Sequence, residues 1–395
     1  MPGLPGLPGL SGAVRVLGPA ISAVVLLVIG AASLAVLNGQ LPTVGGNNGP
    51  PIKTPTPSNI VVVDRRSNIP GELVYVKDGN LWLQSGAQAT QITTGGNDAM
   101  PAWSADGQWI YFIRTTSAKG QWPANGVIRT YDLDIPALVR MHPDGSGLER
   151  VLSGKIQRNG NTWQSFIREP SPNPAGTKVA LITDGPDPTT SDLVLKILDL
   201  TTGGLVNPQL TEIPPLGHQD PAWSPDGSAI LFVQDARIGT RGAPVIERYD
   251  LATKHLKALT GPGYLSPSWS PDGRYVVATN TGSFGTDIVI LDARSGAELL
   301  RVTNGELSFD PVWSPAGDAI AFFRVDHGVV DLELAPLTGT APSWTVGQTI
   351  QLTISAGIDA GSRASWYIPP EELPTAPPST APSLAFPTLH ASTAP

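Results

Sequence analysis

The sequence of 395 residues contains no cysteine. This absence excludes disulfides, catalytic thiols, cysteine-based metal sites and a lipid anchor on cysteine. Histidine is also scarce: only five are present, and none is paired at the spacing of a metal site. The sequence therefore predicts a protein without a bound metal or cofactor.

Basic residues are fewer than acidic ones, 25 against 33, and the formal net charge is −8. The tryptophans do not lie among lysines and arginines, so nucleic acid is not an expected partner. The sequence also lacks a Gly-x-Ser-x-Gly elbow, a phosphate-binding glycine loop and a His-Glu-x-x-His motif. Enzymatic activity is therefore uncertain, and the sequence favours binding without a reaction.

What the sequence does contain is a repeated stretch, Pro-Ala-Trp-Ser-Pro-Asp-Gly at 221–227. Repeats decide the fold class, so they are considered first. Successive copies begin 69, 51, 46, 44 and 53 residues apart. The further copies, from near-identical to fragmentary, are 101–107, 170–176, 267–273, 311–317 and 364–366.

Each copy predicts a tight turn between two strands. In Ser-Pro-Asp-Gly, serine bonds the backbone, proline fixes φ, and glycine ends a type I turn. The motif aspartates 106, 226 and 272 are interpreted as turn residues rather than as catalytic carboxylates. Apolar runs follow each turn, and a second strand–turn–strand signal follows each run. Four strands, A to D, in units of roughly 40–50 residues are typical of a β-propeller.

Six motifs predict six blades, and the two ends of the repeat region predict how the ring closes. Residues 72–76, 80–83 and 90–93 look like strands B, C and D without a strand A. Residues 363–368 look like a strand A without its followers. Pairing them completes one blade and removes two exposed sheet edges. The predicted fold is an all-β, six-bladed propeller with this "velcro" closure.

The repeats resemble the WD-type repeats of the TolB C-terminal β-propeller, over about residues 70–368. The resemblance implies a closed propeller and leaves function open. Similar propellers occur in Tol-Pal translocation proteins, in gating domains of prolyl-oligopeptidase-like enzymes, in polysaccharide lyases and in bacterial envelope proteins. The mixed-fold N-terminal domain of TolB has no counterpart here.

The ends of the chain predict an extracytoplasmic location. Residues 16–37 carry no charge, and 22 residues suffice to span a bilayer. Arg15 precedes them, which favours a cytoplasmic tail at 1–15, a signal-anchor helix in the cell membrane and an exported propeller. A secreted protein with a cleaved signal peptide is the alternative. Residues 38–69 and 369–395 are rich in proline and small residues, and are expected to form a linker and a disordered tail.

Two insertions, Thr115–Pro136 and Ser153–Arg168, interrupt the regular repeat and are predicted to be long loops. The first joins strands B and C, and the second joins strand D to the next strand A, so both lie on one face of the disc. Functional residues favour loops on rigid scaffolds. Aromatic and basic residues on this face form the candidate binding face, although such aromatics also serve to pin loops. These residues are Trp122, Arg129, Tyr131, Trp163, Phe166, Arg168, His218, Arg237, Arg241 and His327.

Two functions are compatible with these features. The first is a membrane-anchored module that binds a protein, peptide or glycan partner in a bacterial envelope. The alternative is a lyase or hydrolase that acts on polysaccharide at the channel mouth. A convergent set of His, Glu or Asp side chains in the channel would distinguish the enzyme from the binding module.

Overall fold

The computed structural model describes most of the repeat region. The described residues are 66, 69–124, 127–186, 192–208, 210, 217–235, 243–282 and 285–374. The predicted signal-anchor segment, 16–37, lies outside them, as does most of the C-terminal tail. Within these residues, no helix has the length and apolar character required to cross a membrane.

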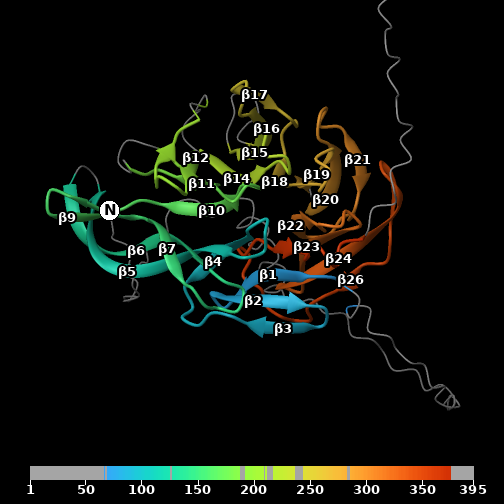
Figure 1. Cartoon of the computed structure of the whole chain (residues 1–395), viewed down its shortest axis with the longest axis horizontal. Coiled ribbons are helices and arrows are strands. Elements are labelled where there is room, and N and C mark those ends of the chain that lie inside the picture. Colours follow the sequence, from blue (N-terminus) through green and yellow to red (C-terminus); the bar gives the residue numbers. More distant parts are fainter. Residues whose placement is uncertain are drawn as a thin grey trace, which may run out of the picture.

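Six four-stranded antiparallel sheets surround a central axis as the blades of a propeller, with the innermost strand of each named first here (Figure 1). Blade 1 is formed by β27 (Ser365–Tyr367), β1 (Glu72–Lys77), β2 (Asn80–Ser85) and β3 (Gln88–Gln91). Blade 2 is formed by β4 (Asp98–Trp103), β5 (Ile110–Ala124), β6 (Val127–Met141) and β7 (Glu149–Ser153). Blade 3 is formed by β10 (Ile167–Pro172), β11 (Lys178–Thr183), β12 (Val194–Asp199) and β13 (Leu205–Val206).

The other three blades repeat this order, and blade 6 carries one additional short strand. Blade 4 is formed by β14 (His218–Trp223), β15 (Ala229–Gln234), β16 (Val245–Asp250) and β17 (His255–Ala258). Blade 5 is formed by β18 (Tyr264–Trp269), β19 (Tyr275–Thr281), β20 (Thr286–Asp292) and β21 (Glu298–Arg301). Blade 6 is formed by β22 (Ser308–Trp313), β23 (Ala319–Asp326), β24 (Val329–Thr340) and β25 (Ser343–Val346), and β26 (Ile350–Gln351) pairs with β24.

The repeated motif forms the turn between the first two strands of a blade, as predicted. The Gly227 N–H donates to the Ser224 carbonyl at 2.9 Å, and Gly227 has φ +70°. The Ser224 hydroxyl donates to the Asp226 carboxylate at 2.6 Å and accepts from the Ala229 N–H at 2.9 Å. These bonds, with the Ser224 hydroxyl as the largest cause, lower the pKa of Asp226 to about 2. The Asp226 carboxylate therefore stabilises the turn in which it lies.

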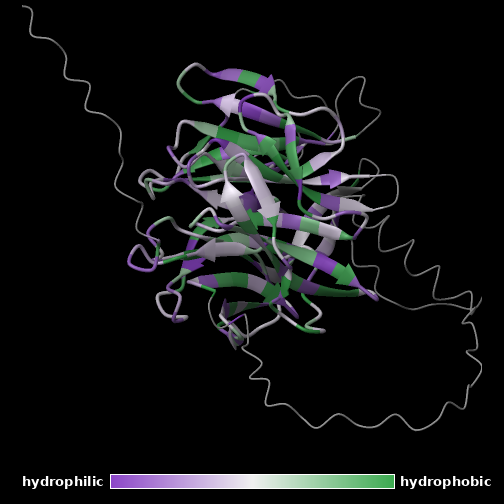
Figure 2. Cartoon of the chain, turned by 90° about the vertical axis from the view of Figure 1, so that its right-hand side faces the viewer, coloured by the Kyte–Doolittle hydropathy of each residue, from purple (hydrophilic) through white to green (hydrophobic). Residues whose placement is uncertain are grey.

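The motif tryptophans pack between blades. Trp103, Trp223, Trp269, Trp313 and Trp366 are each at most 8% exposed. The Trp269 indole N–H donates to the Ala222 carbonyl of the preceding blade at 3.1 Å. Strands B and C supply the rest of the core, as the apolar stretches on the inner strands in Figure 2 show. Each blade therefore buries its apolar faces against its two neighbours.

Ring closure follows the predicted pairing of the two ends. Strand β27 pairs with β1 in the register Leu73↔Trp366. The approach to β27 adds side-chain bonds, because the Val76 N–H donates to the Ser362 hydroxyl at 2.6 Å and the Gly79 N–H to Asp359 Oδ2 at 2.8 Å. Closure therefore depends on a short strand together with the loop before it.

The structure corrects the two predicted insertions, because much of each is strand rather than loop. Thr115–Pro136 continues β5 and β6 as one antiparallel hairpin, from Thr115↔Pro136 to Ala124↔Val127. The second insertion contains a separate hairpin of β8 (Lys155–Arg158) and β9 (Asn161–Gln164). The paired hairpin satisfies the backbone groups that a loop would leave to water.

The predicted C-terminal tail begins later than Pro369. The Glu372 carboxylate accepts the Gly71 N–H at 3.0 Å, and Leu373 packs against the core cluster between blades 6 and 1. The propeller thus extends to about Pro374.

We expect a chain ending at Gly361 to lose much of its stability, because blade 1 then lacks its inner strand. Loss of a buried tryptophan such as Trp366 alone costs about 3–5 kcal/mol. A domain of this size loses a few degrees per kcal/mol, so the melting temperature should fall by on the order of 10 °C. Calorimetry on both chains measures this fall. A chain ending at Pro374 is the control and should melt like the full chain; an unchanged curve for the shorter chain would contradict velcro closure.

Candidate functional site

The residue before each copy of the motif, whether the copy begins with proline or with Ala364, occupies a strained position on the channel axis. At these six positions φ lies between +47° and +55°, and the pairing of strands A and B shifts register there in blades 2 to 6. Positive φ is uncommon outside glycine, and a bulge re-aims the side chain. The six residues, here called the bulge ring, are Met100, Glu169, Asp220, Ser266, Asp310 and Arg363.

The bulge turns a backbone N–H away from strand B in blades 2 to 6, and at four junctions the preceding blade supplies an acceptor for it. The Asp220 N–H donates to Glu169 Oε2 at 2.6 Å, and the Ser266 N–H donates to Asp220 Oδ2 at 2.9 Å. The Glu169 N–H contacts the Met100 sulfur at 3.4 Å, and the Asp310 N–H donates to the Thr279 hydroxyl at 3.1 Å. The Ser266 hydroxyl donates to Asp310 Oδ1 at 2.5 Å. The bulge ring is thus a chain of bonds that passes from blade to blade.

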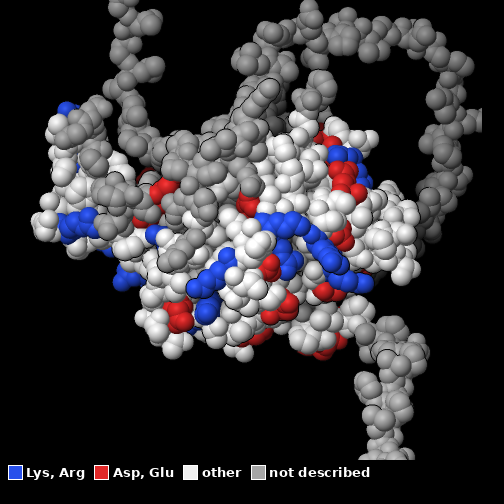
Figure 3. All heavy atoms as spheres, turned by 90° about the horizontal axis from the view of Figure 1, so that it is seen from above, with Lys and Arg blue, Asp and Glu red and all other residues white. Residues whose placement is uncertain are grey.

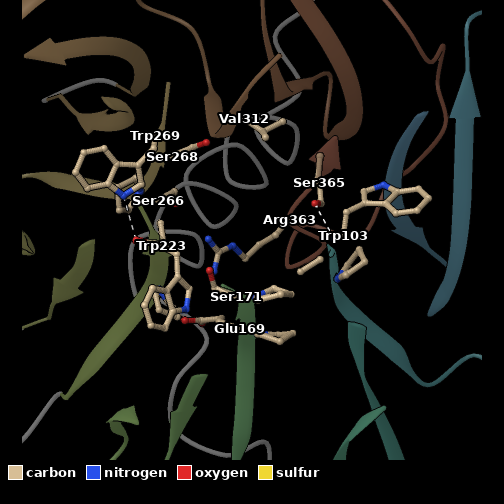
Figure 4. Close-up of a pocket in the computed structure, with 18 of the residues that line it drawn as sticks. Trp103, Glu169, Ser171, Trp223, Ser266, Ser268, Trp269, Val312, Arg363 and Ser365 are labelled. Atoms are coloured by element: carbon tan, nitrogen blue, oxygen red, sulfur yellow. Dashed lines mark hydrogen bonds between the residues drawn. The ribbon is translucent and has the colours of Figure 1, made fainter. Parts of the chain in front are cut away.

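A central cavity of about 300 Å³ lies beside the bulge ring. Its walls are the motif prolines and the tryptophans 103, 223 and 269, and it reaches the turns between strands A and B. Of its lining residues, Arg363 carries the one positive charge, and its guanidinium points into the cavity (Figure 4). Arg363 comes from blade 1 and contacts Asp220 Oδ1 of blade 4 at 3.4 Å, so it crosses the channel to the opposite blade.

Burial dominates the electrostatics of this site. Burial, followed by repulsion from Asp220, raises the pKa of Asp310 to about 6. Burial also raises the pKa of Glu169, against the attraction of Arg168. For Arg363, burial lowers the pKa, but the three carboxylates around it outweigh this effect and raise it. Protonation of Asp310 and Glu169 therefore reduces the negative charge that Arg168 and Arg363 do not neutralise.

A fourth carboxylate, that of Asp235, lies outside the bulge ring, but carboxylates of the ring contribute to its raised pKa. Asp235 follows β15, and burial, reinforced by Asp220 and Glu169, raises its pKa to about 8. In the described part of the chain, no three His, Asp or Glu side chains are grouped so as to hold a metal ion.

The bulge ring was not predicted from the sequence, although a signal was present. The repeated motif begins at its proline, whereas Glu169, Asp220, Asp310 and Arg363 stand one position before it. Four charged residues at one register of a repeat that otherwise holds apolar and turn residues mark a common location in the fold. The channel thus does contain converging carboxylates, which was the feature expected of an enzyme.

The candidate binding face centres on a projection from blade 2. Residues 115–124 and 127–136, here called the blade-2 arm, extend beyond the disc with β9 beside them, at the left of Figure 1. The Trp122 ring meets the Phe166 ring edge-on at 6.3 Å, and the Thr162 N–H donates to Gln121 Oε1 at 2.8 Å. Both insertions therefore form one unit.

The connection after β9 joins this unit to blade 3. The Phe166 N–H and the Ser165 hydroxyl donate to Asp184 Oδ1 at 2.7 and 2.8 Å. Arg129 is exposed on the arm opposite Trp122, while Tyr131 and Trp163 are half-buried. Five of the predicted residues, Trp122, Arg129, Tyr131, Trp163 and Phe166, thus belong to the blade-2 arm or to the chain between it and blade 3. Arg168 lies in β10 of blade 3 and pairs with Glu169 at 2.9 Å.

The other predicted residues do not join this unit. His218 is 3% exposed, accepts the Leu195 N–H at 3.1 Å and pairs with Gln234 at 3.0 Å. Burial lowers its pKa to about 4, so His218 belongs to the core rather than to an exposed face. His327 is exposed at the turn between β23 and β24, in blade 6. Arg237 and Arg241 lie outside the described residues.

We expect Asp310→Asn to stabilise the protein at pH 7.5. The folded pKa of about 6 lies above the ordinary value near 3.9, so the stabilising contribution is complete below pH 4 and is lost as the pH rises through 6. At about 1.4 kcal/mol per pH unit, the gain reaches up to 3 kcal/mol at pH 7.5 and vanishes near pH 4. Urea unfolding at both pH values measures it.

Asp226→Asn is the matched control with the opposite sign. The pKa of Asp226 is lowered to about 2, so its contribution is present above pH 4 and is lost as the pH falls through 2. The substitution should therefore destabilise the protein at pH 7.5. Equal effects of the two variants would refute this electrostatic account of the bulge ring.

Comparison with known proteins supports the fold. No family model matches the chain. The uncharacterized protein Atu1656 of Agrobacterium fabrum is 28% identical over 158 residues, which are 38% of this chain and 45% of that protein. The chain thus spans less than half of this relative.

Solved structures extend the comparison to the whole propeller. TolB from Acinetobacter baumannii superimposes with a TM-score of 0.53 at 18% identity, over 75% of this chain and 66% of that chain. A chain of the nidogen/laminin complex gives a TM-score of 0.51 at 10% identity, over 75% of this chain and 98% of its own. Identities this low show the fold alone. The described part of the chain is a six-bladed β-propeller of the TolB type.

Proposed function

We propose that this chain is a membrane-anchored, extracytoplasmic binding module that presents the blade-2 arm to a protein, peptide or glycan partner in a bacterial envelope. The observation that carries the proposal is the length of the arm. Strands β5 and β6 each have 15 residues, whereas β15 and β16 of blade 4 have six. The propeller fold does not require these additional strand residues, so their presence favours a partner on this face.

The construction of the arm supports a binding role. A two-stranded ribbon alone is marginally stable in water, and the β8–β9 hairpin supports this one. Near the tip, Val127 and Ile128 are 53% and 56% exposed, and Arg129 is exposed beside them. Consecutive side chains of a strand point to opposite faces, so each face of the arm presents one exposed apolar side chain near its tip.

The charge distribution is compatible with a protein, peptide or glycan partner. Acidic and basic side chains lie among one another on the side of the molecule in Figure 3. Such a surface favours no highly charged polymer, because steering requires a field of one sign.

The place where the described chain enters the propeller supports the proposed anchor. The described chain begins beside Gly71, which adjoins the end of β27 and the turns between strands A and B. The blade-2 arm lies on the opposite face. A membrane anchor at 16–37 would therefore attach on the face away from the arm, which leaves the arm open to partners.

The alternative function is a lyase or hydrolase with its site in the channel. Two carboxylic acids with raised pKa, Glu169 and Asp310, border the cavity and favour this alternative. Against it, one carboxylate oxygen of Glu169 and one of Asp220 each accept a hydrogen bond from a backbone N–H of the next blade. These bonds make the carboxylates part of the scaffold, so binding remains the better-supported function.

We expect Arg129→Ala and Trp122→Ala to weaken partner binding by about 1–4 kcal/mol each, the range of aromatic and arginine anchors at interfaces. Arg129 is exposed, so its removal tests binding without disturbing the fold. The measurement is recovery of partners from envelope extracts on immobilised full-length variants, followed by titration of the recovered partner. His255→Ala, exposed on the opposite face, is the control. Unchanged binding by both arm variants would refute the arm as the binding face.

The anchor has its own test. The mature protein should keep residues 16–37 and remain with the membrane fraction after a high-salt wash. A reporter fused after Pro395 should be active only outside the cytoplasm. N-terminal sequencing of the mature protein measures the first point, and a sequence that begins near Val36 would establish a cleaved signal peptide instead.

A further inference from the structure

A second cavity, of about 200 Å³, lies between blades 5 and 6 on the face of the motif turns. Its walls include the aromatic rings of Tyr275, Trp313 and Trp344, and the turn residues Pro271 and Gly317. Trp344 meets Tyr275 edge-on at 4.7 Å and Trp313 at 5.8 Å. This aromatic cleft is smaller than the roughly 300–1,000 Å³ of sites for drug-sized ligands.

The aromatic cleft exists because blade 6 departs from the repeat. Strand β24 has 12 residues, against seven in β20, and its extension pairs with β25 from Leu337↔Val346 to Thr340↔Ser343. This hairpin brings Trp344, which is half-buried, over the side of the motif turn of blade 5. The rim carries Asp272, so the cleft combines aromatic walls with a polar edge.

Aromatic-lined grooves of this kind dock proline-rich segments. A polyproline II segment is already extended, so it loses little conformational entropy on binding, and its rings pack on accessible aromatic faces. In this cleft the accessible ring is that of Trp344, because Tyr275 and Trp313 are buried beneath it. The chain itself carries such a segment. Residues 374–387 contain five prolines, begin with the P-x-x-P sequence Pro374-Thr375-Ala376-Pro377, and include no charged residue.

The exit point of the chain places this segment near the aromatic cleft. Leu373 and Ala316 pack against the same buried cluster, and Ala316 also lines the cleft. The Glu372 carboxylate fixes the chain at Gly71 on this face. Packed sheets lie about 10 Å apart, so one blade separates the exit from the cleft. Pro377 and Pro378 lie four and five residues after Leu373, which is about 12–16 Å of polyproline II and covers that distance.

We propose that the aromatic cleft binds the proline-rich C-terminal segment of the same chain, around Pro377 and Pro378. The tail then lies across blade 6 on the motif-turn face. This contact is independent of the blade-2 arm, which lies on the other face.

The lack of cysteine permits a direct test on the full-length chain. Ser343→Cys, exposed in β25, and Ser379→Cys, in the tail, take spin labels at these two positions alone. Pulsed electron resonance should give a single narrow distance distribution, in place of the broad distribution of a free linker. Pro377→Ala with Pro378→Ala should abolish the narrow component without touching the folded domain, and Trp344→Ala should do the same.

Trp109→Ala is the matched control, because Trp109 is another half-buried tryptophan on the same face and stacks on His142 at 4.1 Å. It should preserve the narrow distribution. A broad distribution in the parent chain would overturn the proposal, and would leave the cleft to a proline-rich peptide or a glycan from elsewhere. A narrow distribution that survives the proline and Trp344 substitutions would also overturn it, because the tail would then be held at another site.

Discussion

The propeller depends on how each blade satisfies the N–H that its own bulge releases. The motif proline has no N–H, and the residue before it turns its own away from strand B. A buried N–H without an acceptor is costly, so the preceding blade must supply one. At Asp220 and Ser266 the acceptor is the bulge side chain of the blade before. One irregularity of the strand thus fixes the spacing of neighbouring blades at the axis.

This constraint explains why charge is found at the centre of an all-β domain with so few charged residues. Carboxylates are strong acceptors, and one oxygen of Glu169 or Asp220 suffices for a neighbouring N–H. The remaining negative charge is offset by Arg363 and by raised pKa values at Glu169 and Asp310. The polar bonds hold the blades at the axis, while the motif tryptophans hold them farther out.

The sequence was sufficient for the fold, because its information is repeated. Six copies of a turn with a known hydrogen-bond pattern define the blades, and the unmatched strands at 72–93 and 363–368 define the closure. The blade-2 arm could be located but not described, since its residues alternate too weakly to separate a long hairpin from a loop. The bulge ring was missed because its four charged residues stand just outside the repeated motif, and only φ and register show that this position faces the axis in each blade. His218 was misplaced for a related reason: its burial is set by Phe232 and Gln234, which only the sheet brings beside it.

The reach of Arg363 across the channel bears on the order in which the domain is made. Chains emerge from the ribosome N-terminus first, so blades 3, 4 and 6 are complete before residue 363 appears. Until then, Glu169, Asp220 and Asp310 would converge on the axis without the one cation of the central cavity. That repulsion disfavours a tightly closed ring in the unfinished chain and keeps the gap for blade 1 open. Arrival of the last strand brings both the missing sheet edge and the missing positive charge, so one short segment supplies both requirements for closure of the ring.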